Sequence, residues 1–527
     1  MSQTNSSLKS RPRQVWSSRI GVIMAVAGSA VGLGNFLRFP VQAAQNGGGA
    51  FMIPYFVALI LLGIPLMWVE WAMGRYGGRY SHGSAPGIFD AIAGRRGIYK
   101  HLGAVGLLGP LLIVFYYMFI ESWTLGYAFY ALTGKLGALK ESGQLRDFLS
   151  GYQGVSHNEH FRGLGPAYVF FVLTFALNFG VVYLGVVHGI ERVNKIAMPL
   201  LAVLGVILTA RVLTLGAPDP AHSDWNVSAG LGFLWNPDLS RLQEPKVWLA
   251  AAGQILFTLS VGIGTILTYG SYLKPQDDVA LSGLTASATN EFFEVIIGGS
   301  VVIPAAVVFF GAAQAVEIAQ SGSFNLGFVT MPLIFTKMLG GQAFCVMWFL
   351  LLFLAGLTSS ISLLQPAISF LEDELHFRRH KAVGLTALVC FAMCQLAIFG
   401  LGLGAVDEMD FWGGTFLIVL SALVELVVFG WVFGMRRGWE ELHVGAEIRI
   451  PRVFRFVIQF VTPLYVLIML VWFCRENWRG VFLMENYQES RPFILVLRLV
   501  LLLLLAGLCW LIHYSWKRHP KHERPIS

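Results

Sequence analysis

The sequence predicts an all-α polytopic membrane protein with about twelve transmembrane helices. Apolar runs long enough to cross a bilayer recur along the whole chain of 527 residues. The composition agrees, because 56% of the residues are hydrophobic, only 13% are charged and the mean hydropathy is +0.65. Two of the runs, the first and the sixth, are interrupted by glycines at corresponding places. This pattern leaves no room for a large soluble domain.

The first interruption lies at residues 28–35, GSAVGLGN, in the middle of the first apolar run. Each of its glycines weakens a helix by about 1 kcal/mol relative to alanine, and Ser29 and Asn35 are polar at mid-membrane depth. Backbone that leaves the helix at this depth must be buried in protein or line a cavity. Residues 257–264, FTLSVGIG, repeat the pattern in the sixth run. The sequence therefore predicts two broken helices.

The apolar runs predict the order of the spans. They lie near residues 19–44, 50–74, 102–130, 166–187, 195–215, 247–272, 280–310, 343–371, 383–402, 411–434, 454–473 and 493–514. The two broken helices therefore begin two five-helix repeats, spans 1–5 and 6–10, and an odd number of helices inverts the second repeat. The predicted parts are an N-terminal tail 1–18, a first repeat 19–215, an outer loop 216–246, a second repeat 247–437, two extra helices 438–515 and a C-terminal tail 516–527.

The formal net charge of +7 does not indicate a nucleic-acid partner, because the basic residues lie in short segments between the apolar runs. The positive-inside rule places both termini in the cytoplasm, in a multi-pass protein of the cell inner membrane or plasma membrane. The five cysteines indicate no disulfide or metal framework. The basic clusters behind this orientation are Lys9/Arg11/Arg13, Arg75/Arg79, Arg95/Arg96/Lys100, Arg378/Arg379/Lys381, Arg436/Arg437 and Lys517/Arg518/Lys521/Arg524.

The two breaks supply groups for an anion and for a cation. Free N–H groups at half-helix N-termini suit a carboxylate. Unpaired carbonyls and neutral polar side chains suit sodium, and the lack of fixed charge among them favours a monovalent ion over calcium. The predicted oxygen donors are the carbonyls of Gly28, Ala30 and Val31, the amides of Asn35 and Asn290, and the hydroxyls of Thr258, Thr358 and Ser359.

Six motifs follow one another along the chain. They are AGSAVGLGNFLRFP at residues 27–40, NGGGAF at 46–51, ESWTLG at 121–126, FTLS at 257–260, AGLTSS at 355–360 and DEMDFW at 407–412. Together they resemble the signature of the neurotransmitter:sodium symporter family, and in particular its prokaryotic leucine-transporting members. The resemblance implies a secondary transporter that works by alternating access, with sodium as the coupling ion and no cofactor.

The resemblance also implies two sodium sites and a substrate pocket. The first sodium site would combine the substrate carboxylate with Ala30, Asn35, Thr258 and Asn290. The second would use Gly28, Val31, Ala355, Thr358 and Ser359. The Tyr117 hydroxyl and the Gly34 N–H would hold the substrate carboxylate. The implied pocket residues are Ser29, Ala30, Leu33, Gly34, Ile113, Tyr117, Phe257, Thr258, Ser260, Ile263, Ser359 and Leu363.

Three pocket positions bear on the substrate. Gly32 stands where amine-transporting relatives carry an aspartate, so the substrate itself must bring the carboxylate, which favours an α-amino acid. Ser29 and Ile263 stand where the leucine-transporting relatives have an asparagine and a phenylalanine. Because one methylene changes binding by only about 1–3 kcal/mol, we expect several hydrophobic L-amino acids, leucine-like or aromatic, to be accepted.

Charged residues complete the implied machinery. Glu294 stands where chloride-dependent relatives have a serine, so its carboxylate would replace chloride. Arg38 and Asp410 correspond to an outer gate, and Arg13 and Asp373 to an inner gate. Exposed ion pairs of this kind are weak enough to open and close during transport.

We therefore predict a sodium-coupled importer of hydrophobic L-amino acids that uses two sodium ions and needs no chloride. Three alternatives stay open: proton coupling through Glu294 or Glu70, a non-transporting amino-acid receptor on the same scaffold, and a channel. A membrane enzyme is not indicated, because the sequence has no HExxH or GxSxG motif. The expected partners are the amino acid, sodium and the lipid bilayer, and the sequence leaves open whether the protein is a monomer or a homodimer.

Overall fold

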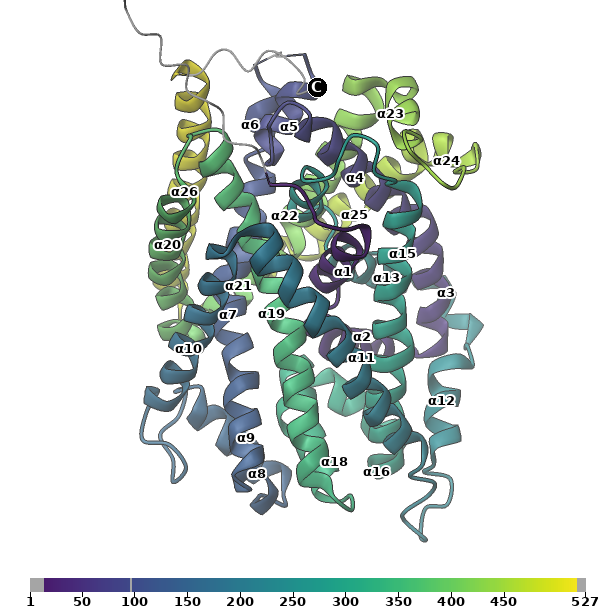
Figure 1. Ribbon diagram of the computed structural model, residues 1–527. Coiled ribbons are helices and arrows are strands. Elements are labelled where there is room, and N and C mark those ends of the chain that lie inside the picture. The colour runs from purple at the N-terminus through teal and green to yellow at the C-terminus, as the bar shows by residue number, and fades with distance from the viewer. Residues whose placement is uncertain (1–13, 95–96, 519–527) are drawn as a thin grey trace, which may run out of the picture.

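The computed structural model describes residues 14–94 and 97–518, which form a bundle of helices (Figure 1). Within these residues the only β-pairing is an isolated bridge between Gly48 and Pro237. The all-α class that the composition predicts is confirmed. Ten of the described helices are long and apolar enough to cross a membrane: Gly49–Gly78, Tyr99–Leu132, Gly165–Tyr183, Val186–Leu213, Ala280–Gln320, Gly341–Asp373, Arg379–Phe399, Ala405–Leu442, Val453–Glu476 and Arg491–Lys517.

Two interrupted helices complete the set of spans. The first consists of α1 (Arg19–Ala30) and α2 (Leu33–Gln45), which are bent by 47° relative to each other. The second consists of α13 (Pro245–Thr258) and α14 (Thr265–Gly270), separated by residues 259–264. Both interruptions lie where the sequence predicts them. Counting α1 with α2 as one span gives up to eleven spans among the described residues, and α13 with α14 occupies the place of the sixth predicted span.

The first break is a short extended step between α1 and α2. Val31 has φ −75° and ψ 90°, and Gly32 has φ −118° and ψ −166°, so both residues leave the helical region. Asn35 Oδ1 accepts a hydrogen bond from Gly32 N at 2.8 Å, which caps the first turn of α2. A Cβ at position 32 would lie 2.7 Å from Ser359 Oγ and 3.1 Å from Tyr117 Oη. The larger aspartate side chain therefore does not fit here without rearrangement.

The second break contains three residues with positive φ. The φ angles are 53° at Ser260, 73° at Gly262 and 78° at Gly264. Glycine adopts such angles freely, whereas serine does so only when its surroundings hold it there. Two hydrogen bonds hold this segment: Ser260 Oγ donates to Ser29 O at 2.8 Å, and Gly262 N donates to Glu70 Oε1 at 2.6 Å. Glu70, a fully buried residue of α4 (Ile64–Gly78), thus stabilises the break.

We expect Glu70→Ala to destabilise the protein by about 1–3 kcal/mol, because it leaves the buried Gly262 N–H without an acceptor. Glu70→Gln keeps an acceptor oxygen for this N–H and should be less damaging. Thermal unfolding of the purified variants in detergent, followed by tryptophan fluorescence, measures the difference. Equal stability of the two variants would show that Glu70 does not support the break through this hydrogen bond.

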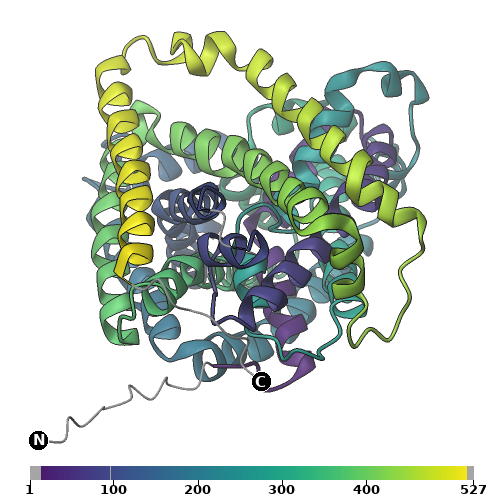
Figure 2. The same cartoon turned by 90° about the horizontal axis from the view of Figure 1, so that it is seen from above.

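Burial is greatest around α7 (Val105–Leu132) and lowest at the last span. In an apolar 18-residue stretch of the span Tyr99–Leu132, 94% of the residues are buried, compared with 22% in the equivalent stretch of Arg491–Lys517. Figure 2 shows α26 (Arg491–Arg518) at the rim of the bundle. Its Leu502 and Leu503 side chains are exposed, as expected for a helix that faces lipid. Residues 28–35 and 258–264 are all buried, so the breaks lie inside the protein, where irregular backbone is tolerated.

The loops divide between two faces of the bundle. One face carries residues 14–18, α5 (Ala85–Ile92) and α23 (Met435–Leu442), and Trp516, near the end of α26, donates from Nε1 to Asp90 Oδ2 at 2.7 Å there (Figure 1). Arg75 Nε donates to Glu441 Oε1 at 2.9 Å on the same face. We call it the N-terminal face. It contains the predicted cytoplasmic basic cluster Arg75/Arg79.

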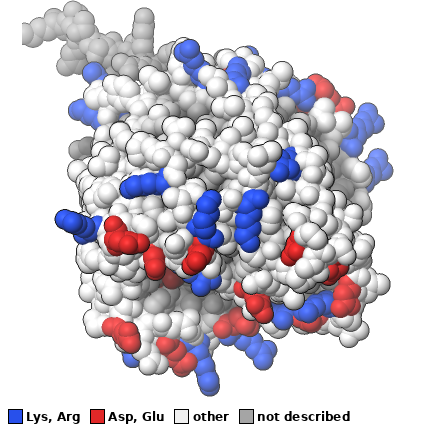
Figure 3. All heavy atoms as spheres, turned by 90° about the horizontal axis from the view of Figure 1, so that it is seen from below, with Lys and Arg blue, Asp and Glu red and all other residues white. Residues whose placement is uncertain are grey.

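The opposite face contains helices within the predicted loops. Residues 134–164 include α8 (Lys135–Ala138) and α9 (Ser142–Tyr152), and the predicted outer loop 216–246 includes α12 (Val227–Trp235). The segment that follows α16 (Gly299–Gln320) forms α17 (Ser323–Asn325) and α18 (Met331–Thr336). Acidic and basic side chains are interspersed on this face (Figure 3).

Candidate functional site

The two helix breaks meet at the carbonyl of Ser29. Ser260 Oγ, from the second break, donates to Ser29 O at 2.8 Å, and Ser359 Oγ, from α19 (Gly341–Asp373), donates to it at 2.9 Å. Ser29 Oγ lies 2.7 Å from Ser362 Oγ. All four serines are buried. The structure thus brings three predicted pocket residues together and adds Ser362, which lies three residues beyond Ser359 on the same face of α19.

The side chains of the predicted first sodium site form one buried cluster. Asn35 Nδ2 donates to Asn290 Oδ1 at 2.8 Å and to Thr258 Oγ1 at 3.2 Å. These residues come from α2, α13 and α15 (Ala280–Glu291), and none is more than 1% exposed. Ala30, whose carbonyl is the fourth predicted protein ligand, is the last residue of α1. Side chains from three helices therefore converge beside the first break.

Glu294 contacts every side chain of this cluster. It lies on η4 (Phe292–Gly298) and is fully buried. Its Oε2 accepts hydrogen bonds from Asn35 Nδ2 at 3.1 Å, from Asn290 Nδ2 at 3.4 Å and from Thr258 Oγ1. Its Oε1 accepts from Gln254 Nε2 at 2.7 Å. Neutral oxygens with one carboxylate in direct contact form a donor set that fits sodium better than a divalent ion.

Gln254 is a member of this buried cluster that the motifs did not single out. It is fully buried on α13, one helical turn before Thr258. Its position four residues before a predicted ligand places both side chains on one helix face, and this spacing was a usable signal. Its hydrogen bond holds Oε1 of Glu294, whereas the Asn35 cluster contacts Oε2.

The predicted second sodium site lies between α1 and α19. Thr358 Oγ1 donates to Ala355 O at 3.1 Å, and Ser359 Oγ lies 3.5 Å from Gly28 O. Gly28 packs directly against Thr358, since a Cβ on Gly28 would lie 3.3 Å from Thr358 Cβ. Val31 is buried immediately after the end of α1. The predicted donors of this site are all neutral oxygens from these two helices.

The predicted substrate pocket has a polar end and apolar walls. Leu33 N donates to Tyr117 Oη at 3.1 Å, so this hydroxyl lies at the N-terminus of α2, where N–H groups favour a carboxylate. Phe257 covers Gly34 closely, because a Cβ on Gly34 would lie 2.7 Å from Phe257 Cε1. The other apolar residues predicted for the pocket are also buried: Ile113, Ile263 and Leu363.

The predicted outer-gate residues have other partners. The guanidinium of Arg38 lies over the Phe257 ring, 4.3 Å from its centroid. Asp410 Oδ1 accepts a hydrogen bond from Tyr116 Oη at 2.5 Å. No ion pair within the described part of the chain joins Arg38 to Asp410. Arg38, Phe257 and Asp410 are all half-buried, so this side of the pocket is only partly covered.

On the N-terminal face, Trp16 packs against Tyr269 and Tyr272 at the end of the second broken helix. It is 4% exposed, and its Nε1 donates to Tyr269 O at 2.9 Å. Asp373, one predicted inner-gate residue, accepts a hydrogen bond from Ser369 Oγ at 3.0 Å. Arg13, the other, lies outside the described residues. Trp16 is thus buried, whereas Arg38 and Asp410 are half-buried.

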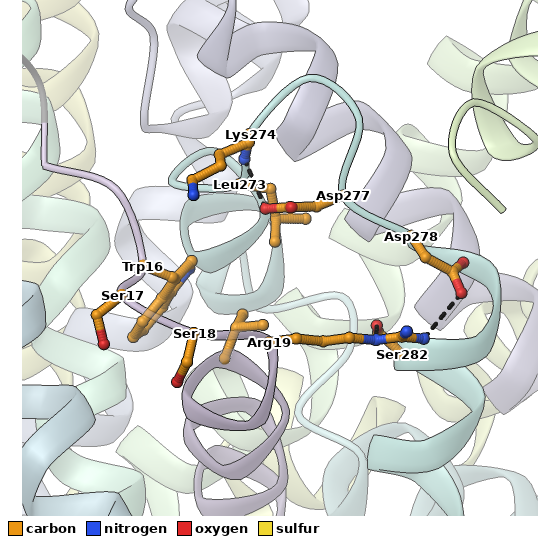
Figure 4. Close-up of a pocket in the computed structure, with 10 residues that line it drawn as sticks. Trp16, Ser17, Ser18, Arg19, Leu273, Lys274, Asp277, Asp278 and Ser282 are labelled. Atoms are coloured by element: carbon orange, nitrogen blue, oxygen red, sulfur yellow. Dashed lines mark hydrogen bonds and ion pairs between the residues drawn. The ribbon is translucent and has the colours of Figure 1, made fainter. Parts of the chain in front are cut away.

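A surface pocket lies beside Trp16 on the N-terminal face (Figure 4). Arg19 Nη2 pairs with Asp278 Oδ2 at 2.9 Å across it, and Ser17 N donates to Glu191 Oε2 at 3.0 Å. This pocket shares no lining residue with the two helix breaks. Its lining residues are Trp16, Ser17, Ser18, Arg19, Val22, Leu273, Lys274, Asp277, Asp278 and Ser282.

Comparisons with known proteins agree over most of the chain. The model of the Sodium:neurotransmitter symporter family matches residues 13–145 and 146–515. The sodium-dependent transporter MJ1319 of Methanocaldococcus jannaschii is 30% identical over 86% of this chain and 88% of its own. The sodium-dependent nutrient amino acid transporter 1 of Drosophila melanogaster is 25% identical over 89% of this chain and 79% of its own. The crystal structure of MhsT in complex with L-phenylalanine has a TM-score of 0.75 and 30% identity, and the match covers 87% of this chain and 99% of that one.

Proposed function

Because the chain belongs to the Sodium:neurotransmitter symporter family, we propose that it is a symporter that imports hydrophobic L-amino acids with sodium by alternating access. The members of this family are sodium symporters. The relatives of this chain are accordingly named as sodium-dependent transporters. One observation carries the proposal furthest: Asn35, Thr258, Asn290 and Glu294 converge in one buried cluster beside the break between α1 and α2. Such a cluster of oxygens suits a cation that crosses the membrane with the substrate.

Two sodium ions accompany each substrate in this proposal. The first is held by Ala30, Asn35, Thr258 and Asn290, and the substrate carboxylate beside it completes the site. The second is held between α1 and α19 at Gly28, Val31, Ala355, Thr358 and Ser359. Because the first ion and the substrate share a contact, each raises the affinity for the other by the same factor. This coupling makes import depend on sodium.

The proposed substrate is a hydrophobic α-amino acid. The N–H groups at the N-terminus of α2 and the Tyr117 hydroxyl would bind the substrate carboxylate. The buried side chains of Ile113, Ile263 and Leu363 would pack against an apolar substrate side chain. Gly32 leaves no acidic side chain to replace the substrate carboxylate. Two relatives support an amino acid as the substrate: one is named as a nutrient amino acid transporter, and MhsT was crystallised with L-phenylalanine.

Alternating access requires that one side of the pocket opens while the other closes. We assign Arg38 and Asp410 to the outer side and Arg13 and Asp373 to the inner side. The N-terminal face, with its basic clusters, then faces the cytoplasm. The buried Trp16 and the lack of an ion pair between Arg38 and Asp410 among the described residues support the proposal that this conformation is more open on the side of Arg38.

We expect purified protein in proteoliposomes to take up leucine or phenylalanine only with an inward sodium gradient. A membrane potential of 100 mV contributes about 2.3 kcal/mol per ion, which corresponds to about fifty-fold accumulation. The measurement is uptake of labelled amino acid in sodium chloride, choline chloride and sodium gluconate, with protein-free liposomes as the control. A proton gradient imposed without sodium tests the proton-coupled alternative. Uptake that persists unchanged in choline would overturn the proposal.

A further inference from the structure

Asn194 lies beside the proposed second sodium site but belongs to none of the motifs. It is the third residue of α11 (Arg192–Leu213), and its side chain is fully buried. Its Nδ2 donates to Ile190 O at 2.9 Å, one turn earlier, in η2 (Val186–Glu191). This hydrogen bond fixes the rotation of the amide, so the position of the other amide atom, Oδ1, is also fixed.

Asn194 Oδ1 lacks a hydrogen-bond donor. It is buried and accepts no hydrogen bond within the described part of the chain. Buried polar atoms in proteins nearly always have a partner, and an unpaired one calls for an explanation. An amide oxygen is a neutral, hard donor of the kind that binds hard cations. The missing partner of this oxygen is therefore electropositive.

The unpaired oxygen is directed at Gly28, a residue of the proposed second sodium site. A Cβ on Gly28 would overlap Asn194 Oδ1 on one side and would lie 3.3 Å from Thr358 Cβ on the other. Gly28 O is itself 3.5 Å from Ser359 Oγ. Asn194, Gly28, Thr358 and Ser359 thus surround one small buried region between α11, α1 and α19. This arrangement also explains why residue 28 is glycine.

The region around the proposed second sodium site has no charged donor, so a cation there depends on each neutral oxygen. Glu294 provides a carboxylate to the first cluster, whereas the predicted donors of the second site carry no charge. A cation transferred from water into such a place regains its solvation only from the dipoles around it. One more carbonyl oxygen therefore has a large effect on its affinity.

We propose that Asn194 Oδ1 is a further oxygen ligand of the cation at the second sodium site. The inference rests on the proposed function and extends the set of Gly28, Val31, Ala355, Thr358 and Ser359 by a residue from α11. Three helices instead of two then hold this ion. A movement of α11 relative to α1 would weaken the site without any change in α19.

The test compares Asn194→Ala, Asn194→Asp and Leu201→Ala. Leu201 lies seven residues further along the same face of α11, is fully buried and carries no oxygen in its side chain, so it controls for the loss of packing. Two measurements are made on purified protein in detergent: the sodium concentration that gives half-maximal binding of labelled phenylalanine, and the shift in unfolding temperature between sodium chloride and choline chloride without amino acid. The second measurement excludes contributions from the substrate carboxylate.

We expect Asn194→Ala to raise the half-maximal sodium concentration by about tenfold and to lose most of the sodium-dependent shift in unfolding temperature. Asn194→Asp keeps an oxygen at this place but loses the hydrogen bond to Ile190 O, so it should lose less of the sodium dependence than Asn194→Ala. Leu201→Ala should unfold at lower temperature but keep the same sodium dependence. Unchanged sodium dependence in Asn194→Ala, or an equal loss in Leu201→Ala, would overturn the inference. If phenylalanine binding to the unaltered protein needs no sodium, the proposed function itself fails.

Discussion

If the Glu294 carboxylate replaces chloride, as the sequence predicts, Glu294→Ser is expected to make transport depend on chloride. Without the carboxylate, Asn35, Thr258 and Asn290 lose their shared anionic partner, and the substrate carboxylate is then the one negative charge that directly contacts a cation in the proposed site. Hydrogen bonds to charged groups contribute about 1.5–3 kcal/mol, so uptake in chloride-free buffer should fall by about 10- to 100-fold. Chloride should restore most of it, because the shorter serine leaves space for an anion at the same place.

Amino-acid uptake into proteoliposomes is measured in sodium gluconate and in sodium chloride, and the difference shows whether transport depends on chloride. The matched control is Glu291→Gln, which removes a carboxylate from the same stretch of chain. Glu291 accepts hydrogen bonds from Tyr55 Oη at 2.8 Å and from Asn290 Nδ2 at 3.4 Å, and its carboxylate also acts electrostatically on Glu294, but it leaves the Glu294 carboxylate itself in place. We expect Glu291→Gln to transport equally in both salts. A chloride requirement in the unaltered protein, or its absence in Glu294→Ser, would contradict the assignment of Glu294.

The spans and both breaks could be predicted from the sequence, for a physical reason. A helix that crosses lipid must bury its own backbone hydrogen bonds and present about 20 apolar residues, so hydropathy alone locates it. Glycines and polar residues at mid-membrane depth are costly unless they line a site, which is why residues 28–35 and 257–264 were informative. The structure has α1 end at Ala30 and α13 end at Thr258, inside these two stretches.

The partners within the site could not be predicted in the same way. Hydropathy gives no distance between Asn194 and Gly28 or between Ser29 and Ser362, because these contacts depend on how helices far apart in the chain pack. Arg38 illustrates the limit, since the sequence indicates a gate residue but not that its guanidinium lies over Phe257. Helices in polar connections, such as α9 and α12, were also missed, because their apolar faces are too short to stand out from the neighbouring spans.

Asn35→Ala is expected to reduce sodium-dependent uptake by about 100-fold or more. Asn35 Nδ2 donates to Asn290 Oδ1, Thr258 Oγ1 and Glu294 Oε2, while its Oδ1 accepts from Gly32 N. The alanine removes one amide that joins the first break to the cluster, and it leaves the buried carboxylate with one donor fewer. A 100-fold loss corresponds to about 2.7 kcal/mol, which is within the range of one hydrogen bond to a charged group.

A double-mutant cycle separates the charge of the cluster from its shape. Asn35→Asp places a second carboxylate beside Glu294 and should be nearly inactive, because like charges repel strongly where water is excluded. Glu294→Gln leaves no carboxylate and should also be weak without chloride. The combined variant again has one carboxylate among neutral oxygens, so we expect its uptake in sodium gluconate to exceed that of either single variant. If the combined variant is instead weaker than both, the site depends on the positions of these side chains and the single negative charge is not what balances the ion.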